Sequence, residues 1–79
     1  MREKKQYVIF AFSSTTQAMA AESFFQSGGL PGRLIPVPRE ITAGCGFAWR
    51  APVSDRELLV SALRSAGLGW ESVTELMLY

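Results

Sequence analysis

Hydrophobic residues recur along the chain with two different spacings, and each spacing predicts one type of secondary structure. The run Lys5–Phe12 is short, apolar and rich in β-branched and aromatic residues, which predicts a buried strand. After it, Ala18, Ala21 and Phe25 recur at helical spacing and predict a helix that extends to about Ser27. A pair of glycines then supplies a left-handed stop for this helix.

Two short polar motifs predict where helices begin. Ser14 and Gln17 have the spacing of a capping box, in which a hydroxyl accepts a hydrogen bond from a free backbone N–H group. Ser54 and Glu57 repeat that spacing ahead of a second helical stripe, and Gly67 ends the second helix.

Three more segments are predicted to be strands. Arg33–Val37 contains a proline, which cannot donate a hydrogen bond to a neighbouring strand, so this segment predicts an edge strand. Gly46–Ala51 and Trp70–Tyr79 are the other two. The order β-α-β-β-α-β predicts an α+β ferredoxin-like sandwich, in which a four-stranded antiparallel sheet carries two helices on one face. Its first and third strands are central, and we expect residues 1–79 to form a single domain.

The other face of such a sheet carries no helix. Strand alternation puts Tyr7, Ile9 and Ala11, or their alternates, on this open face, together with Phe47 and Trp49 or their neighbours. Because either choice leaves apolar area uncovered, we predict a homodimer that forms through the open sheet face.

Composition narrows the possible chemistry. The formal net charge is +1 and the basic residues are spread along the chain, which argues against nucleic acid as a partner. With no histidine and one cysteine, a zinc site of the usual kind cannot be built within one chain, and we expect no metal and no cofactor. The sequence shows no secretory signal, no internal disulfide and no run of the ~20 apolar residues that span a membrane. We therefore predict a soluble, cytoplasmic protein with no membrane partner.

The single cysteine has unusual neighbours. Cys45 stands between Gly44 and Gly46, behind a proline-stiffened turn that contains Pro38 and Arg39. The two glycines permit unusual backbone angles and leave the sulfur sterically open. Most lone cysteines are small buried hydrophobic residues, but a core residue does not need such neighbours. The flanking sequence therefore favours an accessible, functional thiol.

The predicted topology brings the loop that holds Cys45 to the end of the sheet where the first helix begins. Free N–H groups and the positive end of the helix dipole favour an anion at that helix start. Four hydroxyl residues there are candidate binding residues: Ser13, Ser14, Thr15 and Thr16. Arg39 adds a positive charge, and a helix N-terminus and an arginine both stabilise a thiolate. The alternatives are that Ser14 only caps the helix and that Arg39 is a solvated charge.

Three stretches of the chain carry a resemblance to a known family: residues 16–22, residues 33–41 (RLIPVPREI) and residues 44–48 (GCGFA). In these the chain resembles the family of small selenium/sulfur carrier proteins, over nearly its whole length. The resemblance implies that Cys45 is the carrier atom and that Pro38, Arg39 and Gly46 form its setting.

A carrier thiolate would attack an activated sulfur or selenium donor and hold the atom as a persulfide or perselenide. Its partners would be a cysteine desulfurase-like donor and an acceptor protein. Because no general base stands out, we expect a carrier and not an enzyme. Two other functions fit the same residues: a small module that senses an anion or metabolite at residues 13–16 with Arg39, and a non-catalytic assembly domain that acts through its sheet face.

Overall fold

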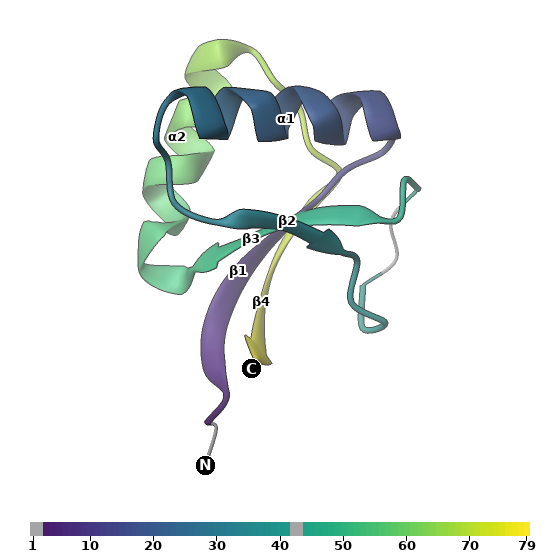
Figure 1. Ribbon diagram of the computed structural model, residues 1–79, viewed down its shortest axis with the longest axis vertical. Coiled ribbons are helices and arrows are strands. Elements are labelled where there is room, and N and C mark those ends of the chain that lie inside the picture. The colour runs from purple at the N-terminus through teal and green to yellow at the C-terminus, as the bar shows by residue number, and fades with distance from the viewer. Residues whose placement is uncertain (1–2, 42–43) are drawn as a thin grey trace.

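The chain folds into one four-stranded sheet with two helices on the same side of it, as the computed structural model in Figure 1 shows for residues 3–41 and 44–79. The elements are β1 (Lys5–Ala11), α1 (Thr15–Ser27), β2 (Arg33–Pro36), β3 (Phe47–Pro52), the short 3₁₀ turn η1 (Val53–Asp55), α2 (Arg56–Ala66) and β4 (Ser72–Leu78). The strand order is β2-β3-β1-β4 and every neighbouring pair is antiparallel. The predicted ferredoxin-like fold is confirmed, with β1 and β3 central and β2 at an edge.

The strand register decides which residues face the helices. Phe10 pairs with Trp49 on one side and with Val73 on the other, and residues that lie directly opposite each other share a face of the sheet. Ile9 pairs with Arg50, so these two residues lie on the opposite face. Of the two arrangements that the sequence allowed, the structure therefore places Trp49 under the helices and leaves Tyr7, Ile9 and Ala11 on the open face.

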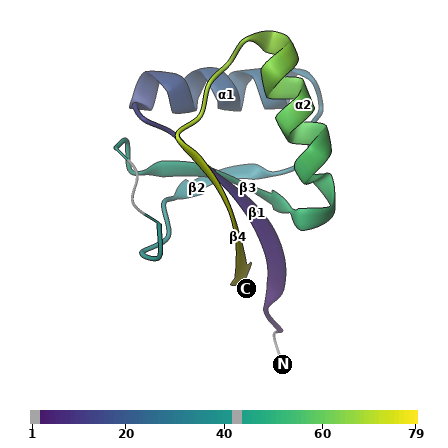
Figure 2. The same ribbon diagram turned by 180° about the vertical axis from the view of Figure 1, so that it is seen from behind.

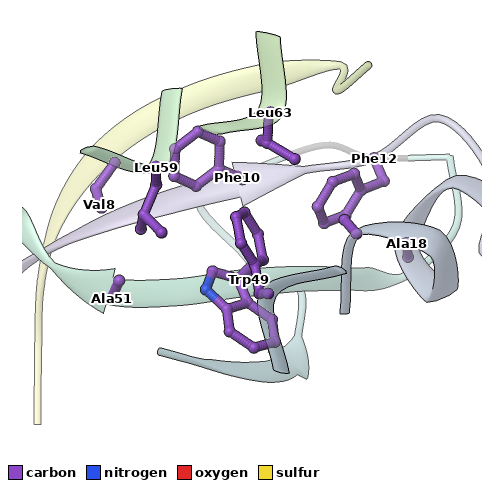
Figure 3. Close-up of a cluster of buried hydrophobic side chains, with 10 residues drawn as sticks. Val8, Phe10, Phe12, Ala18, Trp49, Ala51, Leu59 and Leu63 are labelled. Carbon is purple, nitrogen blue, oxygen red and sulfur yellow. The ribbon is translucent and has the colours of Figure 1, made fainter. Parts of the chain in front are cut away.

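The core lies between the sheet and the two helices and is dominated by aromatic rings. Figure 3 shows Phe10 of β1 beside Leu59 and Leu63 of α2, and Trp49 of β3 belongs to the same cluster. The rings of Phe25 and Trp49 pack with their centroids 4.8 Å apart, a distance at which aromatic pairs add to the free energy gained from burial alone. The indole N–H of Trp49 donates to the Pro31 carbonyl oxygen at 3.0 Å, so the polar group of this buried ring is satisfied.

The first predicted capping motif is confirmed and the second is wrong. The Ser14 hydroxyl accepts from the Gln17 backbone N–H at 3.1 Å, and α1 begins at the next residue. At α2 the N-cap is Asp55, which makes no side-chain capping bond, while Ser54 lies inside η1. The 3₁₀ turn after β3 delays the helix, so Ser54 stands too early in the chain to cap it.

The helices do not cover the whole length of the sheet. In Figures 1 and 2 the N-terminal part of β1 and the C-terminal part of β4 run on together beyond both helices. Large apolar side chains are exposed there, among them Met77 of β4 and Tyr79, which follows this strand. None of the helices in the described ranges is both long and apolar enough to cross a membrane.

Candidate functional site

The segment that connects β2 to β3 carries the cysteine and is closed at its base by the backbone. The Val37 N–H donates to the Gly46 carbonyl oxygen at 2.9 Å, which extends the pairing of the two strands by one bond. The Ile41 N–H donates to the Pro38 carbonyl oxygen at 3.0 Å and forms a tight turn. The connection therefore has two parts, a turn at residues 38–41 and a return segment at residues 44–46.

The return segment packs against the start of α1. A Cβ atom added to Gly44 would stand only 2.6 Å from the Ser13 carbonyl oxygen, so these two backbones touch. Figure 1 shows the chain that leads into β3 beside the beginning of α1. The predicted location of Cys45, at the sheet end where the first helix begins, agrees with this contact.

The Cys45 sulfur forms hydrogen bonds with the backbone of Phe47, two residues later in the chain. Sγ accepts from the Phe47 N–H at 3.3 Å and donates to the Phe47 carbonyl oxygen at 3.2 Å. The N–H group can donate to the sulfur of a thiol or of a thiolate. The carbonyl oxygen, by contrast, accepts only from the S–H group of the thiol. The side chain is half-buried and also packs against the edge of the core, so the thiol is more enclosed than the expected open loop residue.

The two glycines beside Cys45 have different roles. Gly46 has a φ of 78°, a left-handed conformation that favours glycine, and beyond its chain neighbours nothing lies within 4 Å of its missing side chain. Gly46 thus gives the predicted steric clearance. Gly44 instead allows close packing against Ser13, a role that the sequence did not suggest.

The hydroxyl residues before α1 serve the helix start. Besides the Ser14 cap, the Ser13 N–H donates to the Gln17 side-chain oxygen at 2.8 Å, so this pair of bonds closes the first turn on both sides. Thr15 and Thr16 are exposed on the first turn of α1. The structure therefore supports the capping interpretation of Ser14, while ligand binding by these four residues stays a prediction.

Among the described residues, the hydrogen bonds of the Cys45 sulfur go to Phe47 and none joins it to Arg39. Arg39 and Glu40 are exposed at the tip of the turn that begins at Pro38. In Figure 1 this turn points away from α1, and the return segment with Cys45 lies toward it. Within the described residues Arg39 takes part in no hydrogen bond or ion pair, so its role in stabilising a thiolate stays a prediction.

The residues that the structure describes contain no group of three or more His, Cys, Asp or Glu side chains that could hold a metal ion. They also enclose no pocket.

The backbone of Phe47 is the functional group that sequence reasoning missed. A backbone N–H and C=O are present at every position, so only the left-handed turn at Gly46 could have indicated that they fold back onto the sulfur. Phe47 as a whole residue is 41% exposed beside this site, which leaves an exposed apolar residue near the thiol.

Comparison with known proteins shows a match to one family model. The sequence model of a family described as "Putative Se/S carrier protein-like" matches residues 7–75, which include the whole segment between β2 and β3. No curated protein and no solved structure matches the chain.

Proposed function

Because the chain belongs to the Se/S carrier protein-like family, we propose that it carries a sulfur or selenium atom on Cys45 and delivers it to an acceptor protein. The donor is a protein that holds the atom as a persulfide or selenosulfide, as a cysteine desulfurase does. This role needs one reactive sulfur and surfaces on which two partners dock, and it agrees with the description of the family as Se/S carrier protein-like.

Loading is an exchange at a sulfur–chalcogen bond. The Cys45 thiolate attacks the terminal sulfur of the donor persulfide, the donor's S–S bond breaks, and the donor sulfur leaves as a thiolate. Cys45 then carries the terminal sulfur with its proton as a persulfide, and no external oxidant or reductant is consumed. With selenium in the terminal position, the same exchange leaves a selenosulfide on Cys45.

Delivery is the reverse type of exchange. An acceptor thiolate attacks the terminal atom, and the Cys45 sulfur leaves with the electron pair of the broken bond. The Phe47 N–H lies 3.3 Å from this sulfur and can donate to it while it carries the charge. Release therefore takes place beside a hydrogen-bond donor that belongs to the first residue of β3.

The observation that carries the proposal is the position of the one cysteine of the sequence, between Gly44 and Gly46 at the start of β3. A second cysteine would attack the bound persulfide, close a disulfide and expel the chalcogen. The sequence contains no such residue, so a loaded Cys45 has no internal competitor.

Intact mass spectrometry tests the proposal. The protein is incubated with a cysteine desulfurase and either cysteine or selenocysteine, and the expected result is a mass gain of one sulfur or one selenium atom that a reducing agent removes. Cys45→Ser is the matched control, since it keeps the size and polarity of the side chain and lacks the nucleophile. Equal uptake by Cys45→Ser, or no uptake by the unaltered protein from either donor, overturns the proposal.

A further inference from the structure

The open face of the sheet, the side without helices, carries basic side chains and no acidic ones on its strands. Arg33 of β2 lies directly opposite Arg50 of β3, and Lys5 lies on the same face of β1. Directly opposite residues on antiparallel strands have Cβ atoms about 5 Å apart, so the arginine pair repels itself. The four strands contain a single acidic residue, Glu75. It pairs with Val8 and therefore faces the helices.

Within the part of the chain that the structure describes, these charges form no ion pair and no side-chain hydrogen bond. The ion pair found there joins Arg56 of α2 to Glu75, away from the open face. Arg50 instead places its guanidinium 3.9 Å from the centroid of the Tyr7 ring. The segment between β2 and β3 lies on the same side of the sheet in Figure 1. It contains one basic and one acidic residue, Arg39 and Glu40, whose charges cancel.

The apolar part of the open face suits side chains of another protein better than nucleic acid bases. Ile9 and Ala48 at its centre are fully buried although no helix covers them, while Ile35, Leu76 and Leu78 around them are half-buried. RNA-binding sheets offer free aromatic rings on which bases stack. Here the aromatic ring on the four strands of this face is Tyr7, and Arg50 already lies over it.

We propose that the open sheet face is the docking surface for an acidic protein partner, whose carboxylates bind Arg33 and Arg50 and whose aliphatic side chains contact Ile35 and Leu76. Arginine binds carboxylates in a planar, two-pronged geometry, and a carboxylate between the two guanidinium groups removes their mutual repulsion. The assignment stands whether or not Cys45 carries a chalcogen, because it rests on the charges and the register of the strands.

The same charges disfavour a second copy of the chain as the occupant. Pairing two open faces would place Arg33, Arg50 and Lys5 of both copies in one interface without an acidic strand residue to pair with them. Like charges placed together across an interface weaken binding and exclude that partner. The sequence predicted a homodimer because apolar area would be left uncovered on this face. That area is smaller than expected, since Ile9, Ala11 and Ala48 are already buried.

NMR titration of the ¹⁵N-labelled protein tests the assignment. The probe is a monomeric peptide of Glu, Leu and Ala, compared with the same peptide in which Gln replaces every Glu. We expect saturable shifts of the amide signals of residues 33–35 and 48–50 with the acidic peptide, and a dissociation constant that rises about tenfold or more for the Arg33→Gln/Arg50→Gln protein. Arg64→Gln, which removes a charge from α2 on the other side of the molecule, should change it less than about twofold.

Three outcomes overturn the proposal. The first is that neither peptide shifts these signals, or that both peptides do so equally. The second is unchanged affinity of the Arg33→Gln/Arg50→Gln protein, with a circular dichroism spectrum that shows an intact fold. The third is tighter binding of an oligouridine than of the acidic peptide at this face, or a dimer in sedimentation analysis of the unaltered protein that dissociates when both arginines are replaced.

Discussion

The sulfur of Cys45 and the backbone of Phe47 are joined by two hydrogen bonds, an N–H donor at 3.3 Å and a carbonyl acceptor at 3.2 Å. Serine offers a donor and an acceptor at nearly the same place, whereas alanine offers neither. We therefore expect Cys45→Ser to unfold in urea within about 0.5 kcal/mol of the unaltered protein, and Cys45→Ala to be about 1 kcal/mol less stable. Equal stability of the two variants would show that the hydrogen bonds contribute nothing to folding.

Gly44 and Gly46 give a second prediction because their backbones are constrained in different ways. Alanine at Gly44 would place its Cβ 2.6 Å from the Ser13 carbonyl oxygen, and both backbones would have to move, at a cost of about 2 kcal/mol. Alanine at Gly46 meets open space and has only the strain of a φ of 78°, about 1 kcal/mol. Urea unfolding measures both values.

Gly29→Ala is the matched control for this pair, since Gly29 also has a positive φ, 65°, and open space around it. It should lose about as much stability as Gly46→Ala. Gly44→Ala should in addition slow the loading of Cys45, because it pushes the return segment away from α1. If Gly44→Ala is the most stable of the three variants, the contact with Ser13 is not a packing constraint.

The fold could be predicted from the sequence because its signals are local. The proline in β2 marked an edge strand, and the spacing of Ala18, Ala21 and Phe25 marked the buried side of α1. The start of α2 could not be predicted in the same way. The spacing of Ser54 and Glu57 fits a capping box, but the 3₁₀ turn at residues 53–55 follows from how β3 ends.

The candidate site was predictable in position but not in detail. Strand order alone places Cys45 near the start of α1, and the contact of Gly44 with Ser13 agrees. The direction of Arg39 depends on the turn that begins at Pro38, which no periodicity describes. The contact between two distant backbones at Gly44 leaves no pattern in the sequence beyond the glycine itself.

The two serines that begin apparent capping boxes give a third prediction. Ser14→Ala removes the acceptor for the Gln17 N–H and should lower the free energy of unfolding by about 1 kcal/mol. Ser54→Ala changes an exposed residue of η1 with no capping bond and should stay within about 0.5 kcal/mol. Equal losses in thermal unfolding of the two variants would contradict the assignment of the α2 N-cap to Asp55.

Gly32 and Trp49 give the last prediction, which concerns the packing of β2 against the core. Gly32 has a φ of 116°, and a Cβ atom there would stand 2.5 Å from the Arg50 carbonyl oxygen and closer still to the Trp49 indole nitrogen. The substitution Gly32→Ala therefore strains the backbone and displaces the Trp49 ring from the Pro31 carbonyl oxygen that it binds. A loss of about 3 kcal/mol or more follows from this overlap.

Trp49→Phe separates the two effects, because it removes the indole N–H and part of the ring without straining the backbone at Gly32. Its cost should be about 2 kcal/mol, from the lost hydrogen bond and the smaller ring in the core. In the double variant, the smaller ring leaves room for the added methyl group. The loss of unfolding free energy caused by Gly32→Ala should therefore be at least about 1 kcal/mol smaller in the Trp49→Phe background than in the unaltered protein. Additive losses, measured by urea unfolding followed by circular dichroism, would show that the methyl group at Gly32 does not meet the indole ring.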